Sequence, residues 1–171
     1  MSDNIYLGNP NLKKANTPVE FTKEQIKEFI KCKQDPVYFA QNYVKIVSLD
    51  EGLVPFDMYK FQKKLIRNFH NHRFNICKMP RQTGKSTTCV SFLLHYAVFN
   101  DNVNIGILAN KAATARELLG RLQTAYENLP KWMQQGILSW NKGSMELENG
   151  SKILAASTSA SAVRGMSFNI I

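Results

Sequence analysis

The segment Met79–Thr87, Met-Pro-Arg-Gln-Thr-Gly-Lys-Ser-Thr, constrains the fold of this chain more than any other feature. An apolar, β-rich run at residues 73–78 precedes it, and a helix is predicted over residues 86–99. A strand, a tight loop with Gly-Lys-Ser and a helix, in this order, are the context of a phosphate-binding P-loop. The backbone N–H groups of such a loop and the N-terminus of the following helix bind anions together.

The match to the full pattern, G-x-x-x-x-G-K-[ST], is partial, because Met79 stands where the first glycine belongs. Gly84, Lys85 and Ser86 occupy the other fixed positions. In a P-loop, Lys85 would reach the β- and γ-phosphates and Ser86 would ligate Mg²⁺. The alternative is a glycine that ends a turn and a serine that caps a helix. The flanking strand and helix favour the phosphate site.

Composition places the chain among soluble globular domains. Its 171 residues are enough for one domain with a substantial core. The net charge of +9 favours a polyanionic partner such as nucleic acid, although a solvated basic surface has the same composition. No apolar run approaches the roughly 20 residues of a membrane span, and the first residues lack the pattern of a signal peptide. The three cysteines have neither disulfide nor metal spacing, which predicts buried free thiols in a reducing compartment.

The N-terminal third begins with a polar stretch, residues 1–20, which we expect to form an arm or a loosely packed lead-in. Thr22 and Gln25 fit a capping box at the start of a helix. Asp35 followed by Pro36 is typical of the start of a second helix.

A third helix carries the strongest local charge. Asp57 is expected to cap it, and no acidic residue lies between Met58 and Phe74. Its apolar positions recur at helical spacing, and its other positions carry four cations. These are Lys60, Lys63, Lys64 and Arg67. This surface is either a nucleic-acid contact or a solvated basic face.

The second half alternates strand and helix signals. A strand is predicted over residues 103–109, a helix over 112–128 and a further strand from Ser167. Asn149-Gly150 between two strand-like runs predicts a hairpin with a two-residue turn. Alternating strands and helices imply a parallel α/β sheet with right-handed crossovers.

Taken together, several blocks of sequence resemble the ATPase domain of the large terminase subunit of tailed phages, most closely that of the T4-like myoviruses. The blocks are Phe61-Gln62, Arg81–Thr87, Gly106–Lys111, Trp140–Ser151 and Ala162–Phe168. The resemblance covers roughly residues 5–171. It implies an α/β P-loop NTPase of the ASCE, RecA-like type, with a mainly parallel sheet and flanking helices. An arm at residues 1–20 would then precede a partial ATPase domain at 21–171.

The resemblance also implies a function. That family hydrolyses ATP with Mg²⁺ to drive double-stranded DNA through the portal protein into the prohead. The small terminase subunit and further copies of the large subunit, arranged as a ring on the portal, would be partners in the host cytoplasm. The full-length family chain carries a C-terminal RNase-H-like nuclease as well.

Roles for individual residues follow from the same resemblance. Gln62 would hydrogen-bond the adenine base, with Phe61 beside it or in the core. Arg81 would stabilise the γ-phosphate in cis, unless it is merely an exposed loop arginine. Arg164 would act on a neighbouring subunit's ATP as an arginine finger, or would anchor its loop through a salt bridge. The nucleotide-binding loop comprises Pro80, Arg81, Gln82, Thr83, Gly84, Lys85, Ser86 and Thr87.

One departure from the family pattern concerns the catalytic carboxylates. A Walker B Asp and an adjacent Glu should follow the strand that includes Phe168, whereas this sequence ends at Ile171. The coupling motif and the nuclease would also lie beyond it. Two alternatives therefore stay open, a superfamily 2 helicase-like ATPase fragment and a non-catalytic nucleotide-binding or assembly module. ATP-dependent strand separation would favour the first, and a lack of Lys85-dependent nucleotide binding would favour the second.

We expect the isolated chain to bind ATP weakly, if at all, and to turn it over negligibly, because water activation needs the missing carboxylates. Phosphate release from ATP is the measurement. Robust hydrolysis that Lys85→Ala abolishes would contradict this expectation.

Overall fold

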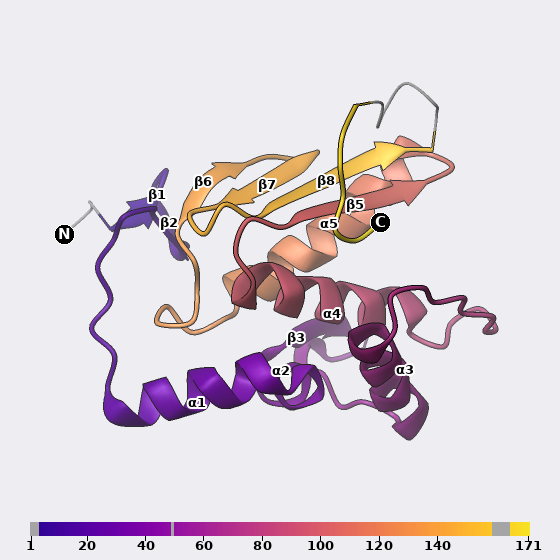
Figure 1. Cartoon of the computed structure of the whole chain (residues 1–171), viewed down its shortest axis with the longest axis horizontal. Coiled ribbons are helices and arrows are strands. Elements are labelled where there is room, and N and C mark those ends of the chain that lie inside the picture. Colours follow the sequence, from indigo (N-terminus) through magenta and orange to yellow (C-terminus); the bar gives the residue numbers. More distant parts are fainter. Residues whose placement is uncertain (1–3, 49, 159–164) are drawn as a thin grey trace.

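The structure is a computed structural model that describes residues 4–48, 50–158 and 165–171. Its helices are α1 (Lys23–Gln34), α2 (Pro36–Tyr43), α3 (Lys60–Asn71), α4 (Lys85–Phe99) and α5 (Ala112–Glu127). Its strands are β1 (Ile5–Tyr6), β2 (Asn9–Lys13), β3 (Lys45–Ser48), β4 (Gly52–Pro55), β5 (Asn104–Ala109), β6 (Ile137–Trp140), β7 (Ser144–Leu147) and β8 (Lys152–Ser157). The elements form three layers: the sheet of β5 to β8, then α5 and α4, then α1 to α3 (Figure 1). None of the helices in these residues is long and apolar enough to cross a membrane.

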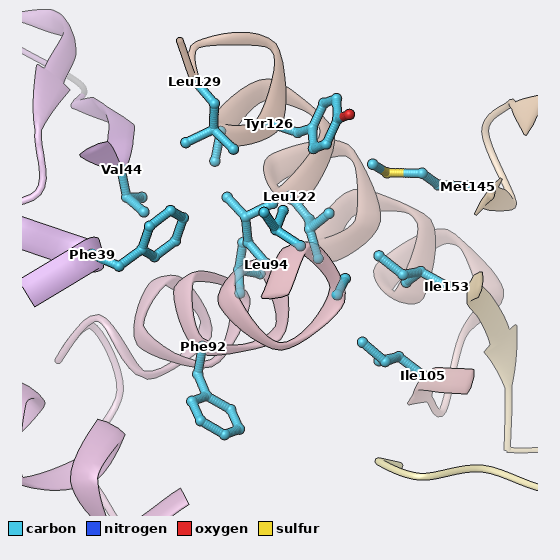
Figure 2. Close-up of a cluster of buried hydrophobic side chains, with 14 of the residues drawn as sticks. Phe39, Val44, Phe92, Leu94, Ile105, Leu122, Tyr126, Leu129, Met145 and Ile153 are labelled. Atoms are coloured by element: carbon cyan, nitrogen blue, oxygen red, sulfur yellow. The ribbon is translucent and has the colours of Figure 1, made fainter. Parts of the chain in front are cut away.

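Helix α4 lies at the centre of the fold. It packs against α5 on one side and against α2 and α3 on the other. Figure 2 shows Leu94 of α4 between Phe39 of α2 and Leu122 of α5, with Ile153 of the sheet beyond. A helix that buries apolar residues on all sides belongs in a core rather than at a surface. The buried residues of α4 are Thr88, Val90, Ser91, Phe92, Leu94, His95, Ala97, Val98 and Phe99.

The main sheet is mixed, with the strand order β5-β8-β7-β6. Strands β5 and β8 are parallel, with Ile105 opposite Ile153, whereas β8–β7 and β7–β6 are antiparallel. The α/β class is confirmed, but the mainly parallel sheet is wrong for the described residues. Short turns join β6, β7 and β8, and strands joined by short turns pair antiparallel. The strand expected from Ser167 appears as one parallel bridge between Ile105 and Ile170.

The strand predicted at residues 73–78 is not present. This segment has no regular secondary structure, and the side chains of Phe74 and Ile76 are 84% and 100% exposed. The edge of β5 away from β8 is occupied by the bridge to Ile170, whose carbonyl accepts the Gly106 N–H at 2.8 Å. β-propensity reflects packing and pairing with neighbouring strands, which this run does not find.

The first two helix starts match the prediction. Thr22 Oγ1 accepts the backbone N–H of Gln25 at 3.2 Å, and Gln25 Oε1 accepts that of Thr22 at 3.0 Å. Asp35 Oδ1 accepts the N–H of Val37 at 2.8 Å, one residue after the proline at the first helical position. Both caps satisfy N–H groups that have no partner within their own helix.

The start of α3 differs from the prediction. Asp57 does not cap this helix; Tyr59 is the N-cap residue, and the helix begins at Lys60. Gln62, in the first turn of the helix, supplies a hydrogen-bond acceptor for the N-cap residue: its Oε1 accepts the Tyr59 N–H at 2.9 Å.

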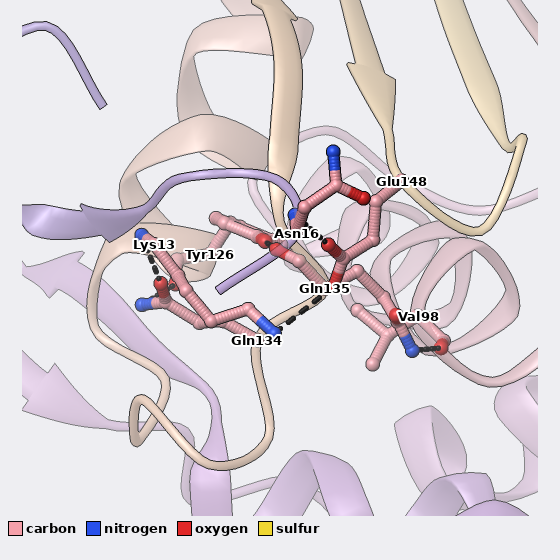
Figure 3. A network of polar contacts seen from close by, with 7 residues as sticks. All are labelled: Lys13, Asn16, Val98, Tyr126, Gln134, Gln135 and Glu148. Atoms are coloured by element: carbon pink, nitrogen blue, oxygen red, sulfur yellow. Dashed lines mark hydrogen bonds and ion pairs between the residues drawn. The ribbon is translucent and has the colours of Figure 1, made fainter. Parts of the chain in front are cut away.

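The described part of the expected N-terminal arm contacts the rest of the fold through Leu12, Lys13 and Asn16. Leu12 is only 2% exposed, and the Lys13 N–H donates to Gln134 Oε1 at 3.0 Å. The Lys13 ammonium lies 2.9 Å from Glu148 Oε1, and the Asn16 N–H donates to Glu148 Oε2 at 2.8 Å (Figure 3). Burial raises the pKa of Glu148, but hydrogen bonds from Gly136, Lys13 and Asn16 outweigh burial, so its pKa lies below the ordinary value. The polar composition concealed this network, because its partners are more than 100 residues away.

The β7–β8 hairpin forms where predicted but with a different turn. A two-residue Asn-Gly turn needs positive φ at both central residues, whereas φ is positive at Gly150 (79°) and not at Asn149. The Gly150 N–H donates to Leu147 O at 3.0 Å. Asn149 Nδ2 donates to the carbonyls of Ala97 at 2.9 Å and Asn100 at 3.0 Å. The turn is thereby anchored to the C-terminal end of α4, which local sequence cannot specify.

The cysteines are free thiols, but only part of the burial prediction holds. Cys32 is buried and Cys89 is partly buried, whereas Cys77 is exposed. Cys77 is exposed because its segment, residues 73–78, stays outside the sheet.

The burial of His95 leads us to expect that the stability of the protein depends on pH. Its Nε2 lies 2.9 Å from Cys32 O, and its Nδ1 is buried without a hydrogen-bond partner among the described residues. Burial lowers the pKa of His95 from 6.5 to about 4, against the opposing effect of the Cys32 carbonyl. Between these two values the unfolded state binds the proton and the folded state does not. Acidification through this window should therefore cost about 3 kcal/mol of unfolding free energy.

Urea unfolding at several pH values measures this cost. In His95→Gln the loss between pH 6.5 and 4 should largely disappear, because no imidazole remains to be protonated on unfolding. His72→Gln, at the end of α3, is the matched control and should keep the wild-type slope. Equal slopes in wild type and His95→Gln would contradict the assignment.

Candidate phosphate-binding site

The loop before α4 has the geometry of an anion site. Gly84 is the N-cap residue of α4 and has a φ of 73°, in the left-handed region that glycine adopts without strain. The N–H groups of Lys85, Ser86 and Thr87 have no hydrogen-bond partner within the part of the chain that the structure describes. They stand at the positive end of a 15-residue helix, which favours a negatively charged ligand.

Lys85 turns its side chain back over the loop. Its ammonium donates to the carbonyl oxygens of Met79, at 3.1 Å, and of Pro80. In a P-loop the lysine ammonium bonds phosphate oxygens, so the Lys85 ammonium lies close to where those oxygens would bind. The substitution of Met79 for the first glycine does not prevent this arrangement, because the lysine uses only the carbonyl of that residue.

Side-chain hydrogen bonds to the carbonyl groups of the loop stabilise its conformation. Thr83 Oγ1 donates to Pro80 O at 3.0 Å, and Thr88 Oγ1 donates to Gly84 O at 2.9 Å. Gln62, only 4% exposed, donates from Nε2 to Thr83 O at 3.2 Å. The sequence placed Gln62 at this site and predicted a contact with the base, which stays a prediction, but it did not single out Thr88. The position of Thr88 four residues after Gly84 is the signal that could have identified it.

Two aromatic side chains lie at the start of α3, on either side of Lys60 and just before Gln62 in the sequence. Phe61 is 43% exposed, so the core alternative for this residue is wrong. It stacks on the more exposed Tyr59, with ring centroids 5.7 Å apart and an interplanar angle of 9°. Sequence reasoning did not single out Tyr59. Its spacing two residues before Phe61, across the helix start, makes the pair possible.

The remaining loop residues are open to solvent. Arg81, Gln82 and Ser86 are exposed, and Thr87 is partly buried in the first turn of α4. Gln82 has a φ of 60°, a conformation that is uncommon for residues other than glycine. Arg164 lies outside the described residues.

The site sits in a basic environment. No Asp or Glu occurs between Asp57 and Asp101. The cations of this stretch are Lys60, Lys63, Lys64, Arg67, Arg73, Lys78, Arg81 and Lys85. Within the described residues the ion pairs involve Lys13, Arg121 and Lys152, none of which belongs to this stretch. The unpaired cations favour a polyanionic ligand.

The described residues offer few side-chain ligands to a metal ion. The described residues contain no group of three His, Cys, Asp or Glu side chains that could hold one. The exposed Ser86 hydroxyl fits the single-ligand role that a P-loop serine has toward Mg²⁺, where phosphates and water supply the other ligands.

The fold is similar to that of part of a phage large terminase. The chain is similar in fold to the crystal structure of the HK97 bacteriophage large terminase, with a TM-score of 0.63 and 19% sequence identity. The match covers 79% of this chain and 29% of that chain. At this identity the likeness concerns the fold alone.

The sequence itself defines the family. A sequence model of the family described as "Terminase large subunit, T4likevirus-type, N-terminal" matches residues 76–171, more than half of the chain. The chain therefore belongs to the T4-like terminase large subunit N-terminal family, as the blocks around the loop predicted.

We expect a side chain at position 84 to lower the stability of the protein. A Cβ at this position would lie 2.5 Å from Gln62 Nε2, and the positive φ disfavours any side chain. Gly84→Ala should lower the unfolding free energy by about 1–2 kcal/mol from the backbone conformation alone. Gly120→Ala, on α5 with open space around its Cβ, is the matched control and should stabilise by about 0.5–1 kcal/mol. Urea unfolding compares the two, and a Gly84→Ala protein as stable as wild type would contradict the described loop.

Proposed function

We propose that this chain supplies the ATP-binding part of a DNA-packaging motor, with a P-loop NTPase fold of the ASCE, RecA-like type. The observation that carries the proposal is the loop itself. Three N–H groups at the start of α4 have no partner among the described residues, and the Lys85 ammonium bonds the carbonyl of Met79 across the loop. Membership of the terminase family is consistent with it.

Each of the loop residues would have its own role in phosphoryl transfer. That reaction needs positioning and charge compensation rather than covalent help from the protein. The N–H groups of Lys85, Ser86 and Thr87 would hold phosphate oxygens. Lys85 would exchange the carbonyls of Met79 and Pro80 for the β- and γ-phosphates, since an anion binds an ammonium more strongly than a carbonyl does. Mg²⁺, held by Ser86, would supply charge neutralisation between these phosphates.

The two arginines would complete the charge compensation. Arg81 is exposed in the loop without an ion-pair partner among the described residues, so it is free to turn toward a γ-phosphate. Arg164 would act in trans on the nucleotide of a neighbouring copy. Arginine fingers of this kind are worth about 10³–10⁵ in rate.

The partners follow from the proposed motor. Double-stranded DNA would be the translocated substrate, and the portal protein, the small terminase subunit and further copies arranged in a ring would be the assembly partners in the host cytoplasm. The exposed side chains of Lys60, Lys64 and Arg67 on α3 offer a surface that suits DNA phosphates.

Lys85 tests the proposal. The geometry of the loop leads us to expect weak but measurable binding of Mg·ATP. Titration followed by calorimetry or by amide shifts of the loop should give an affinity that Lys85→Ala lowers about 10- to 100-fold. That range corresponds to the loss of a charge-assisted hydrogen bond. Lys27→Ala, which removes the same charge from the surface of α1, should leave the affinity unchanged. Equal binding by wild type and Lys85→Ala would contradict the proposed phosphate site.

A further inference from the structure

We propose that a cavity between β3, α4 and α5 is a binding site for a small organic anion with an apolar, ring-containing body. The cavity has a volume of about 640 Å³, within the range of roughly 300–1,000 Å³ that is typical of small-molecule sites. It reaches the first turn of α4 at Thr87, and its other lining residues are distinct from those proposed to hold the nucleotide. The proposal therefore goes beyond the nucleotide site and does not depend on it.

The inner part of the cavity is apolar. Val44, Val90 and Ala125 line it, and each is at most 5% exposed. Val47 of β3 also lines it and is 67% exposed, so apolar surface continues out to solvent. A ring that enters the cavity removes this surface and its own from water, which favours binding.

Gly120 is independent evidence for a site. It lies inside α5 and lines the cavity, although a glycine inside a helix destabilises that helix relative to alanine. Its φ is not positive, and apart from its own helix neighbours no atom of the described residues lies within 4 Å of where its Cβ would be. Packing and backbone conformation within the described residues therefore do not require this glycine. Its missing side chain leaves room for a ligand to approach the backbone of α5 closely.

The charges around the cavity favour an anion. Arg121 pairs with Glu117 at 2.6 Å, so these two side chains largely neutralise each other. Lys45 is exposed and has no ion-pair partner within the part of the chain that the structure describes. The anionic group of a ligand can pair with this lysine while its rings occupy the apolar part. A second cavity of about 460 Å³, beside α1, offers no such cation, because the Lys13 that lines it is paired with Glu148.

Two fluorescent probes that differ in one group test the site. Anilinonaphthalene sulfonate carries an anionic group, and phenylnaphthylamine has the same rings without it. Gly120→Leu places an apolar side chain in the cavity and should weaken both probes about tenfold or more. The variant should stay folded, as urea unfolding can verify, because leucine is a better helix former than glycine. Ala113→Leu adds the same side chain at an exposed position of α5 outside the cavity and should leave both affinities unchanged.

Lys45→Gln tests the anionic group separately. It should weaken anilinonaphthalene sulfonate about two- to fivefold, the contribution of an exposed ion pair, and leave phenylnaphthylamine unchanged. Lys142→Gln, which removes a charge from the exposed segment between β6 and β7, is the matched control and should change neither affinity. An unchanged affinity of Lys45→Gln for the sulfonate would overturn the proposed ligand class.

Amide chemical shifts locate the bound probe. Anilinonaphthalene sulfonate should shift the amides of Ile46, Thr87 and Gly120. Shifts confined to the cavity beside α1, or full binding of both probes by Gly120→Leu, would overturn the proposed site. Lys85→Ala should bind both probes like wild type, because Lys85 does not line the cavity. Failure of the nucleotide site and failure of this site therefore give different results.

Discussion

The burial of α4 fixes the direction in which the phosphate loop points. Side chains from α2, α3, α5 and the sheet surround this helix, and burying one large apolar side chain contributes about 1.5–3 kcal/mol. The helix therefore cannot rotate or slide without opening the core. In its first turn Ser86 is exposed and Lys85 and Thr87 are half-buried, and the N–H groups of these three residues have no partner among the described residues.

The loop itself depends on polar contacts rather than on packing. Gln62, Thr83 and Thr88 donate to loop carbonyls, and Lys85 bonds two more. A single neutral hydrogen bond contributes only about 0.5–1.5 kcal/mol net. A loop held in this way can exchange contacts when an anion binds, while the helix behind it stays in place. A phosphate site requires a helix that stays in place and loop contacts that can rearrange when the anion binds.

Local signals predicted the starts of the first two helices, where the interacting residues lie within one turn of the chain. The Thr22–Gln25 capping box and the Asp35 cap involve residues three or fewer positions apart. The loop with Gly84, Lys85 and Ser86 also lies where the sequence placed it, directly before α4, and its phosphate binding stays a prediction. Predictions failed where a distant partner decides the outcome. Residues 73–78 lack a neighbouring strand.

The sequence by itself determined the α/β class, the caps of α1 and α2, the place of the Gly-Lys-Ser loop before α4 and the terminase family, because each depends on residue types at short, fixed spacings. Tertiary structure alone decided the mixed sheet, the packing of Lys13 and Asn16 against Glu148, and the hydrogen bond from Gln62 to Thr83 O. A polar side chain can bond many partners with equal chemistry. Which of these it meets depends on what lies within about 3 Å once the chain has folded.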